Sequence, residues 1–196
     1  MIGDFLRAVV ILVVGFFVCV FLSRHTKVGS LGKVLPSMNW QMPGQWSRCS
    51  VGCMSLLTPC QLRPVPISEE YAKEQGAAFA SDTIVGGLYS ECYVIVQHVT
   101  LAQGRDAYAL YRELKAKISS EQKRTGGYPL SQKEVLISNC RGEQMIWSFP
   151  EKGVQKRMNR LTIAKNREAW MVMVVSSDGN TANAEIFEKI LNSIRL

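Results

Sequence analysis

The chain has 196 residues, of which 47% are hydrophobic and 20% are charged, and its formal net charge is +7. This is the composition of a globular protein, and the residues beyond position 65 suffice for one domain with its own core. Residues 1–65 hold six basic side chains against one acid, whereas the remainder is close to neutral. Because the folded part shows no basic stripe, we do not expect a nucleic-acid-binding protein.

Residues 8–22, AVVILVVGFFVCVFL, form an uncharged apolar run. A bilayer core requires about 20 helical residues, and extending the run to residues 5–23 gives a slightly short span. A strongly basic segment before the run and a nearby small-x-small cleavage site are both missing, which disfavours a signal peptide. We therefore predict a retained membrane anchor over residues 1–23, with a cleaved signal as the alternative. The predicted anchor residues are Phe5, Leu6, Val14, Phe16, Phe17 and Leu22.

Residues 24–65 show no sustained hydrophobic period and are rich in Gly, Pro and Ser. They also contain Trp and Met, which a plain solvated linker rarely carries. We predict a basic juxtamembrane connector that contacts lipid headgroups or a neighbouring subunit, and a solvated linker is the simpler alternative. The predicted contact residues are Arg24, Lys27, Lys33, Trp40, Trp46 and Arg48.

Three cysteines lie within twelve residues of this connector, in RCSVGCMSLLTPC. A segment with so little core would be stabilised by a disulfide, which favours an oxidising compartment. Free packing thiols and a metal site remain alternatives, although paired zinc spacing and a CxxC motif are both missing. Cys92 and Cys140 are a second candidate pair. The possible disulfide cysteines are thus Cys49, Cys53, Cys60, Cys92 and Cys140.

Two signals in the sequence disagree about the side of the membrane on which the folded domain lies. Disulfides would place the folded domain on the periplasmic or exoplasmic side. The basic residues after the apolar run would instead place it in the cytoplasm. We favour the periplasmic or exoplasmic side, because the charge difference across the run is small.

Residues 66–196 are predicted to form one α+β globular domain. A helical or irregular entry at 68–79 precedes a strand at 88–99 and an amphipathic helix at 106–123. Short connections between the next strands predict an antiparallel meander, and a final helix follows. The fold class is therefore α+β: an N-terminal transmembrane helix, then a mostly antiparallel sheet with helices packed on it. The four meander strands are expected at 134–138, 143–149, 155–164 and 169–176.

A long apolar strand, AWMVMVVSS, a short polar turn and the helix AEIFEKILNSIRL end the chain. This ending resembles the C-terminus of PsbP-like domains, and the resemblance covers about residues 66–196. It implies a PsbP-like sandwich and a non-enzymatic accessory or assembly subunit at a membrane. No ligand residue of the family can be matched to this sequence.

Catalytic motifs are missing from the sequence. GxSxG, HExxH, a P-loop and GxGxxG in a strand–turn–helix setting do not occur. The two histidines are His25, beside the apolar run, and His98, which is expected to be structural. We therefore predict a non-enzyme without a cofactor, a metal or a small-molecule substrate.

The prediction for function combines these observations. We expect a membrane-anchored accessory subunit that docks on or stabilises a larger membrane complex, photosynthetic or respiratory. Its partners would be the membrane and other membrane-protein subunits. The alternative is an exported soluble ligand-binding domain with a cleaved signal peptide.

Overall fold

The computed structural model describes residues 45–65, 79–103, 126–165 and 167–196. The predicted anchor, the helix at 106–123 and nearly all of the entry at 68–79 lie outside these residues. Within the described ranges no helix is long and apolar enough to cross a membrane. This finding contradicts the predicted single-pass membrane protein with a periplasmic or exoplasmic domain.

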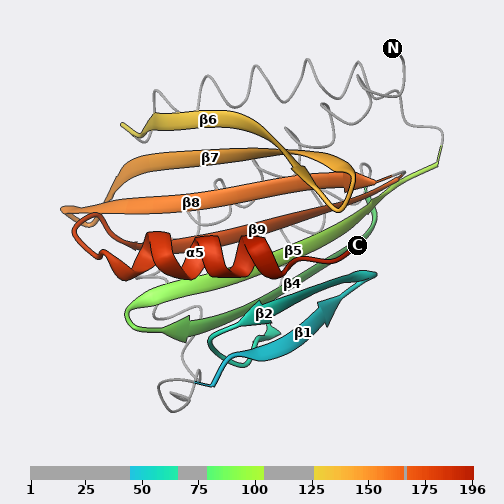
Figure 1. Ribbon diagram of the computed structural model, residues 1–196. Coiled ribbons are helices and arrows are strands. Elements are labelled where there is room, and N and C mark those ends of the chain that lie inside the picture. The colour runs from blue at the N-terminus through green and yellow to red at the C-terminus, as the bar shows by residue number, and fades with distance from the viewer. Residues whose placement is uncertain (1–44, 66–78, 104–125, 166) are drawn as a thin grey trace.

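A seven-stranded antiparallel sheet forms the body of the protein (Figure 1). Its spatial order is β3-β4-β5-β9-β8-β7-β6, and every neighbouring pair is antiparallel. The meander predicted for the second half of the chain is therefore confirmed. The strands are β3 (Arg63–Pro64), β4 (Phe79–Tyr89), β5 (Cys92–Leu101), β6 (Tyr128–Ile137), β7 (Cys140–Glu151), β8 (Val154–Lys165) and β9 (Glu168–Ser177).

Two-residue turns join three of the hairpins. Both turn residues have positive φ in each case, at Ser90–Glu91, Ser138–Asn139 and Lys152–Gly153. Positive φ at both central positions is the signature of a type I′ turn, whose twist matches that of the flanking strands. These turns fix the register of β4 on β5, of β6 on β7 and of β7 on β8.

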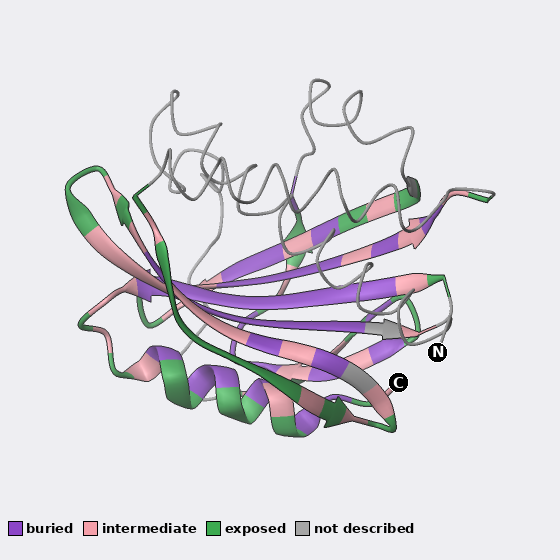
Figure 2. Cartoon of the chain, turned by 90° about the horizontal axis from the view of Figure 1, so that it is seen from above, coloured by how far each residue is buried: buried purple, intermediate pink, exposed green. Residues whose placement is uncertain are grey.

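The central strand of the sheet is β9, with three strands on either side. Eight consecutive residues from Ala169 to Ser176 are buried, so both of its faces are covered. The uninterrupted apolar sequence of this strand had predicted that position. Figure 2 shows the buried centre of the sheet and its more exposed margins.

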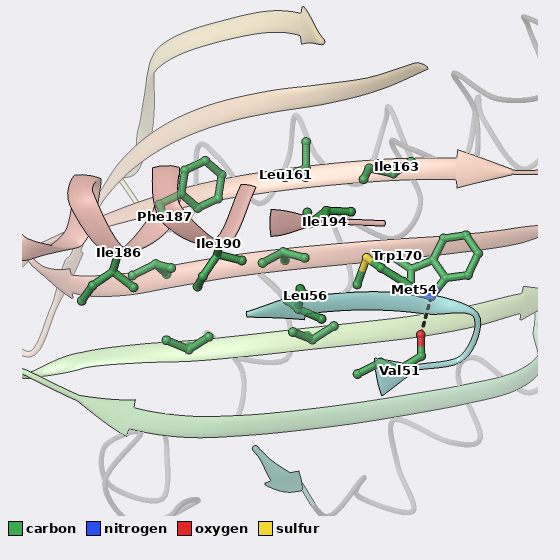
Figure 3. Close-up of a cluster of buried hydrophobic side chains, with 14 of the residues drawn as sticks. Val51, Met54, Leu56, Leu161, Ile163, Trp170, Ile186, Phe187, Ile190 and Ile194 are labelled. Carbon is green, nitrogen blue, oxygen red and sulfur yellow. Dashed lines mark hydrogen bonds between the residues drawn. The ribbon is translucent and has the colours of Figure 1, made fainter. Parts of the chain in front are cut away.

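One face of the sheet is covered by helix α5 (Ala182–Ser193) and a separate hairpin, β1 (Ser47–Val51) and β2 (Met54–Thr58). Figure 3 shows their side chains meeting those of the central strands. A backbone bridge between Ser55 and Arg195 attaches the hairpin to the segment that follows α5. The main core residues are Met54, Leu56, Val94, Val96, Leu161, Ile163, Trp170, Val172, Val174, Phe187 and Ile190.

The predicted fold class, α+β with an N-terminal transmembrane helix and helices packed on the sheet, was wrong. The described residues are mostly antiparallel strand and hold one helix, α5, which matches the helix predicted after the polar turn. The share of strand is higher than predicted, because residues expected to form a connector, an entry and turns form strands instead.

Two strand predictions also need correction. The strand expected at 88–99 is two strands, because Ser90 and Glu91 form a type I′ turn within it. Residues 45–65 were expected to lack regular structure, yet they contain β1, β2 and β3. Val51 and Met54 of this hairpin belong to the main core, so the hairpin is part of the folded domain.

Candidate functional site

The five described cysteines are free thiols, so the disulfides that the sequence favoured are not formed. Burial, together with the nearby Cys49, raises the pKa of Cys60 to about 11. Burial also raises the pKa of Cys92 to about 11, although a hydrogen bond with Ser176 opposes this. Because the thiolate is the reactive and metal-binding form, both thiols are inert at neutral pH.

The register of the sheet separates Cys92 from Cys140. Cys92 adjoins Ser176, which pairs with Arg157, and Arg157 pairs with Ser148. From Ser148 to Cys140 the strand β7 runs about 26 Å, at roughly 3.3 Å per residue. The two thiols therefore lie near opposite ends of the sheet and cannot bond to each other.

His98 and Glu168 meet beside the turn of the β1–β2 hairpin. The His98 Nε2 atom lies 3.3 Å from Glu168 Oε1, and the Cys53 thiol donates weakly to Glu168 Oε2 at 3.9 Å. The His98 ring also stacks on Trp170, with centroids 5.0 Å apart. Glu168 thus accepts from both side chains, whereas a cysteine–histidine nucleophile would require the histidine to contact the thiol.

Close packing explains why this cluster holds the hairpin in place. Gly52 sits over the imidazole, and a Cβ atom there would lie 2.8 Å from His98 Cε1. The Trp170 indole N–H donates to the Val51 carbonyl at 2.8 Å (Figure 3). The cluster is a fastening between hairpin and sheet, in agreement with the structural role predicted for His98. The described residues include no group of three side chains arranged to hold a metal ion.

The sheet face opposite α5 carries buried polar side chains on neighbouring strands. Arg160 pairs with Glu143 at 3.1 Å and also approaches the Met145 sulfur at 3.5 Å. Among the described residues, neither the Arg160 Nε atom nor the Thr162 hydroxyl has a hydrogen-bond partner. Both groups lie on this face because Leu161 and Ile163, which alternate with them along β8, face the core below α5.

Exposed apolar side chains gather on the edge strand β6. The exposed fractions are 52% for Tyr128, 47% for Leu130 and 67% for Leu136. Eight of the ten β6 residues are exposed (Figure 2). Val154, at 47%, is the other large exposed hydrophobic residue in the described part of the chain. These exposed apolar side chains make β6 the candidate contact surface of the described residues.

The residues predicted to contact a partner fall into two groups. Arg24, Lys27, Lys33 and Trp40 lie outside the described residues, as do all the predicted anchor residues. Trp46 is half-buried, and the Lys189 ammonium of α5 lies 4.1 Å from its ring centroid. Arg48 is exposed and donates to the Ser55 hydroxyl at 3.2 Å. Trp46 therefore helps to attach the hairpin to α5, whereas Arg48 links the two strands of the hairpin to each other.

Sequence reasoning missed β6 as a surface. Gly126, Gly127 and Pro129 suggested a turn, so only the end of the strand was predicted. The signal that could have found it is the spacing of Tyr128, Leu130 and Leu136 among polar residues. A strand with Pro near its start belongs at a sheet edge.

Comparison with solved structures identifies the architecture. The solution structure of cyanobacterial PsbP, CyanoP, from Synechocystis sp. PCC 6803 aligns with a TM-score of 0.51 at 11% identity. The alignment covers 82% of this chain and 99% of that one. The fold is PsbP-like. The resemblance inferred from the C-terminal strand, turn and helix is thereby confirmed at the level of fold.

Two other solved structures align less well with this PsbP-like chain. LpqN, involved in cell envelope biogenesis of Mycobacterium tuberculosis, has a TM-score of 0.43 at 14% identity, over 76% of this chain and 89% of that one. A Pseudomonas aeruginosa protein of unknown function has a TM-score of 0.41 at 11% identity, over 74% and 92%. No family model and no curated protein sequence matches the chain.

Proposed function

We propose that this PsbP-like domain is a non-enzymatic accessory subunit that docks on a larger protein assembly and stabilises it. The observation that carries the proposal is the exposed apolar surface of β6, where Tyr128, Leu130 and Leu136 face solvent. Isolated apolar residues are ordinary on a protein surface, but three large ones on one edge strand, with Tyr128 and Leu136 on opposite faces of the sheet, favour this edge as the place of contact.

The described chemical groups support a non-enzymatic role. Cys60 and Cys92 have pKa values raised to about 11 by burial, which keeps them protonated. His98 and Glu168 are engaged with each other and with the hairpin. The PsbP-like resemblance points in the same direction, because that family consists mostly of accessory or assembly subunits.

The test is native-gel or size-exclusion analysis of extracts from the source cells, with the chain tagged at its natural level of expression. We expect migration far above the 21.9 kDa of the chain itself. The double variant Leu130→Ser/Leu136→Ser should return the protein to the monomer position. Val154→Ser is the matched control, since Val154 has the same exposed fraction as Leu130, 47%. A wild-type chain found only as a monomer would overturn the proposal.

A second candidate function is binding of a small ligand at the sheet face opposite α5. The specific observation is the pair of buried polar groups, Arg160 Nε and Thr162 Oγ1, which lack hydrogen-bond partners among the described residues. Buried donors of this kind are ordinarily satisfied, at times by a bound molecule. Native mass spectrometry of the purified chain tests this candidate. A retained small molecule that is absent from Arg160→Met supports it, and a bare wild-type chain excludes it.

A further inference from the structure

Strand β6 is the last strand of the sheet, and among the described residues it pairs with β7 alone. Ile137 and Cys140 flank its type I′ turn, so they form the closing hydrogen-bonded pair of the hairpin. Antiparallel ladders alternate between bonded and non-bonded pairs. Val135 and Lys133 therefore direct their backbone groups toward β7.

The same alternation turns the even-numbered residues outward. The backbone N–H and C=O groups of Gln132, Glu134 and Leu136 point away from β7, along the outer edge of the sheet. Such a row of outward backbone groups is a template for another strand. The pairing of β7 with β8 follows the same parity, because Glu151 and Val154 flank the next type I′ turn.

The two edges of the sheet differ in how well they are protected against pairing with a further strand. At the opposite edge, β3 has only two residues, and one is Pro64, which cannot donate a backbone hydrogen bond. On β6, Pro129 and a register shift between Pro129 and Ser131 interrupt only the start of the strand. A regular edge remains from Ser131 to Ile137, about 20 Å long at roughly 3.3 Å per residue.

A second copy of this chain fits that edge poorly. A twofold axis perpendicular to the sheet keeps the side-chain faces, so only residues on the same face can lie opposite each other. Pairing centred on residue 133 would place Lys133 against its own copy, and pairing centred on residue 134 would do the same for Glu134. Like charges directly opposite each other destabilise a ladder. The register centred on residue 134 is the one that pairs the whole regular edge with its copy, so the charge of Glu134 opposes the most extensive self-pairing.

We propose that β6 accepts an extended segment of a partner protein as an eighth strand. The charges select its sequence: an acidic residue opposite Lys133, a basic residue opposite Glu134 and an apolar residue opposite the exposed Leu136. Main-chain hydrogen bonds to Gln132, Glu134 and Leu136 provide binding, and the side chains provide specificity. This inference rests on the proposed function, since it names how the accessory subunit docks.

The first test uses a synthetic peptide, Val-Ile-Thr-Lys-Glu-Thr-Val, which runs antiparallel to β6 with its Lys opposite Glu134 and its Glu opposite Lys133. The control peptide exchanges Lys and Glu. Fluorescence anisotropy on the full chain should show that the control binds at least about tenfold more weakly, because two opposite-charge pairs become like-charge pairs. Equal binding of the two peptides, or no binding of either, overturns the proposal.

The second test removes an outward backbone donor. Glu134→Pro eliminates an N–H that bonds no strand of the sheet, so the β6–β7 ladder stays intact. Glu134→Ala is the matched control, because both variants lose the carboxylate. We expect Glu134→Pro to lose peptide binding while retaining the circular dichroism spectrum of Glu134→Ala. Equal binding by two folded variants contradicts strand addition.

Hydrogen exchange on the wild-type chain keeps the proposal testable if the proline variant fails to fold. In the free protein, the amides of Gln132, Glu134 and Leu136 should exchange fast, and those of Lys133 and Val135 slowly. Bound peptide should protect the three fast amides, and continued fast exchange refutes strand addition. If Glu134→Pro still migrates with a large assembly in cell extracts, the accessory role stands and the docking surface lies elsewhere.

Discussion

Asn183 joins α5 to the sheet through a buried polar network, and its replacement is a sharp test of the structure. The side chain is 1% exposed and accepts from the Asn159 amide at 2.7 Å. Its own amide donates to the Ser176 hydroxyl at 2.6 Å and to the Arg157 carbonyl at 3.2 Å. Asn183→Leu keeps the branching of the side chain at Cγ but removes all three hydrogen bonds.

The loss of stability follows from the buried polar groups that lose their hydrogen bonds to Asn183. Each buried polar group without a partner destabilises the fold by about 1–3 kcal/mol, and the added apolar burial offsets part of this. We expect Asn183→Leu to lower the free energy of unfolding by about 3 kcal/mol. At the size of this domain, that corresponds to a melting temperature lower by roughly 10 °C.

Urea denaturation followed by circular dichroism measures this loss. The matched control is Asn192→Leu, the same substitution at an exposed position of the same helix. Its free energy of unfolding should stay within about 0.5 kcal/mol of the wild-type value. If Asn183→Leu proves as stable as this control, the network does not stabilise the packing of α5.

Three further predictions concern the hairpin and the thiols. Gly52→Ala should destabilise the fold by about 1–3 kcal/mol, since Gly52 has a φ of +61° and its Cβ would collide with an imidazole, whereas Gly179→Ala, with open space around it, should be nearly neutral in thermal melts. Trp170→Phe should cost about 1–3 kcal/mol in urea denaturation by leaving the Val51 carbonyl without its donor; wild-type stability would contradict that role. The free energy of unfolding should fall as the pH rises from about 9 to 11, because the Cys60 thiol ionises at a lower pH in the unfolded chain than in the folded one. Cys60→Ala should reduce this pH dependence of the urea midpoint. A pH dependence equal to that of the wild type would refute the role of Cys60.

Strong local patterns made the second half of the described chain predictable. The unbroken apolar run of β9 predicted a central strand covered on both faces, and the spacing of Phe187 and Ile190 predicted the apolar face of α5. Both signals are local, because hydrophobic periodicity is written within one element. The same holds for β7 and β8, whose short connection left an antiparallel pair as the simplest arrangement.

The hairpin at 47–58 escaped prediction because its stability comes from distant residues. Its sequence is rich in Ser and Cys, and its strands become ordered by packing on α5 and on Trp170. The cluster of Cys53, His98 and Glu168 was equally unpredictable, since three separate strands and turns bring it together. Tertiary packing of this kind overrides weak local propensity.

The split between β4 and β5 has a different cause. Ser90 and Glu91 both adopt positive φ, although neither is the Gly or Asn that usually marks a type I′ turn. A run of apolar residues on both sides concealed the turn. The same reasoning explains β6, where a Pro at its second position suggested a break that the sheet edge tolerates.

The bridge between Ser55 and Arg195 has a consequence for biosynthesis. The hairpin emerges early from the ribosome, but Arg195, which bonds its strand β2 at 2.8 and 2.9 Å, is translated only after the whole sheet. Contacts between residues so far apart in sequence form slowly. The hairpin must therefore wait, with Met54 and Leu56 uncovered, until α5 and the segment after it have been released. During that interval the nascent chain exposes apolar side chains that favour aggregation and chaperone binding. This exposure should end when Arg195 pairs with Ser55.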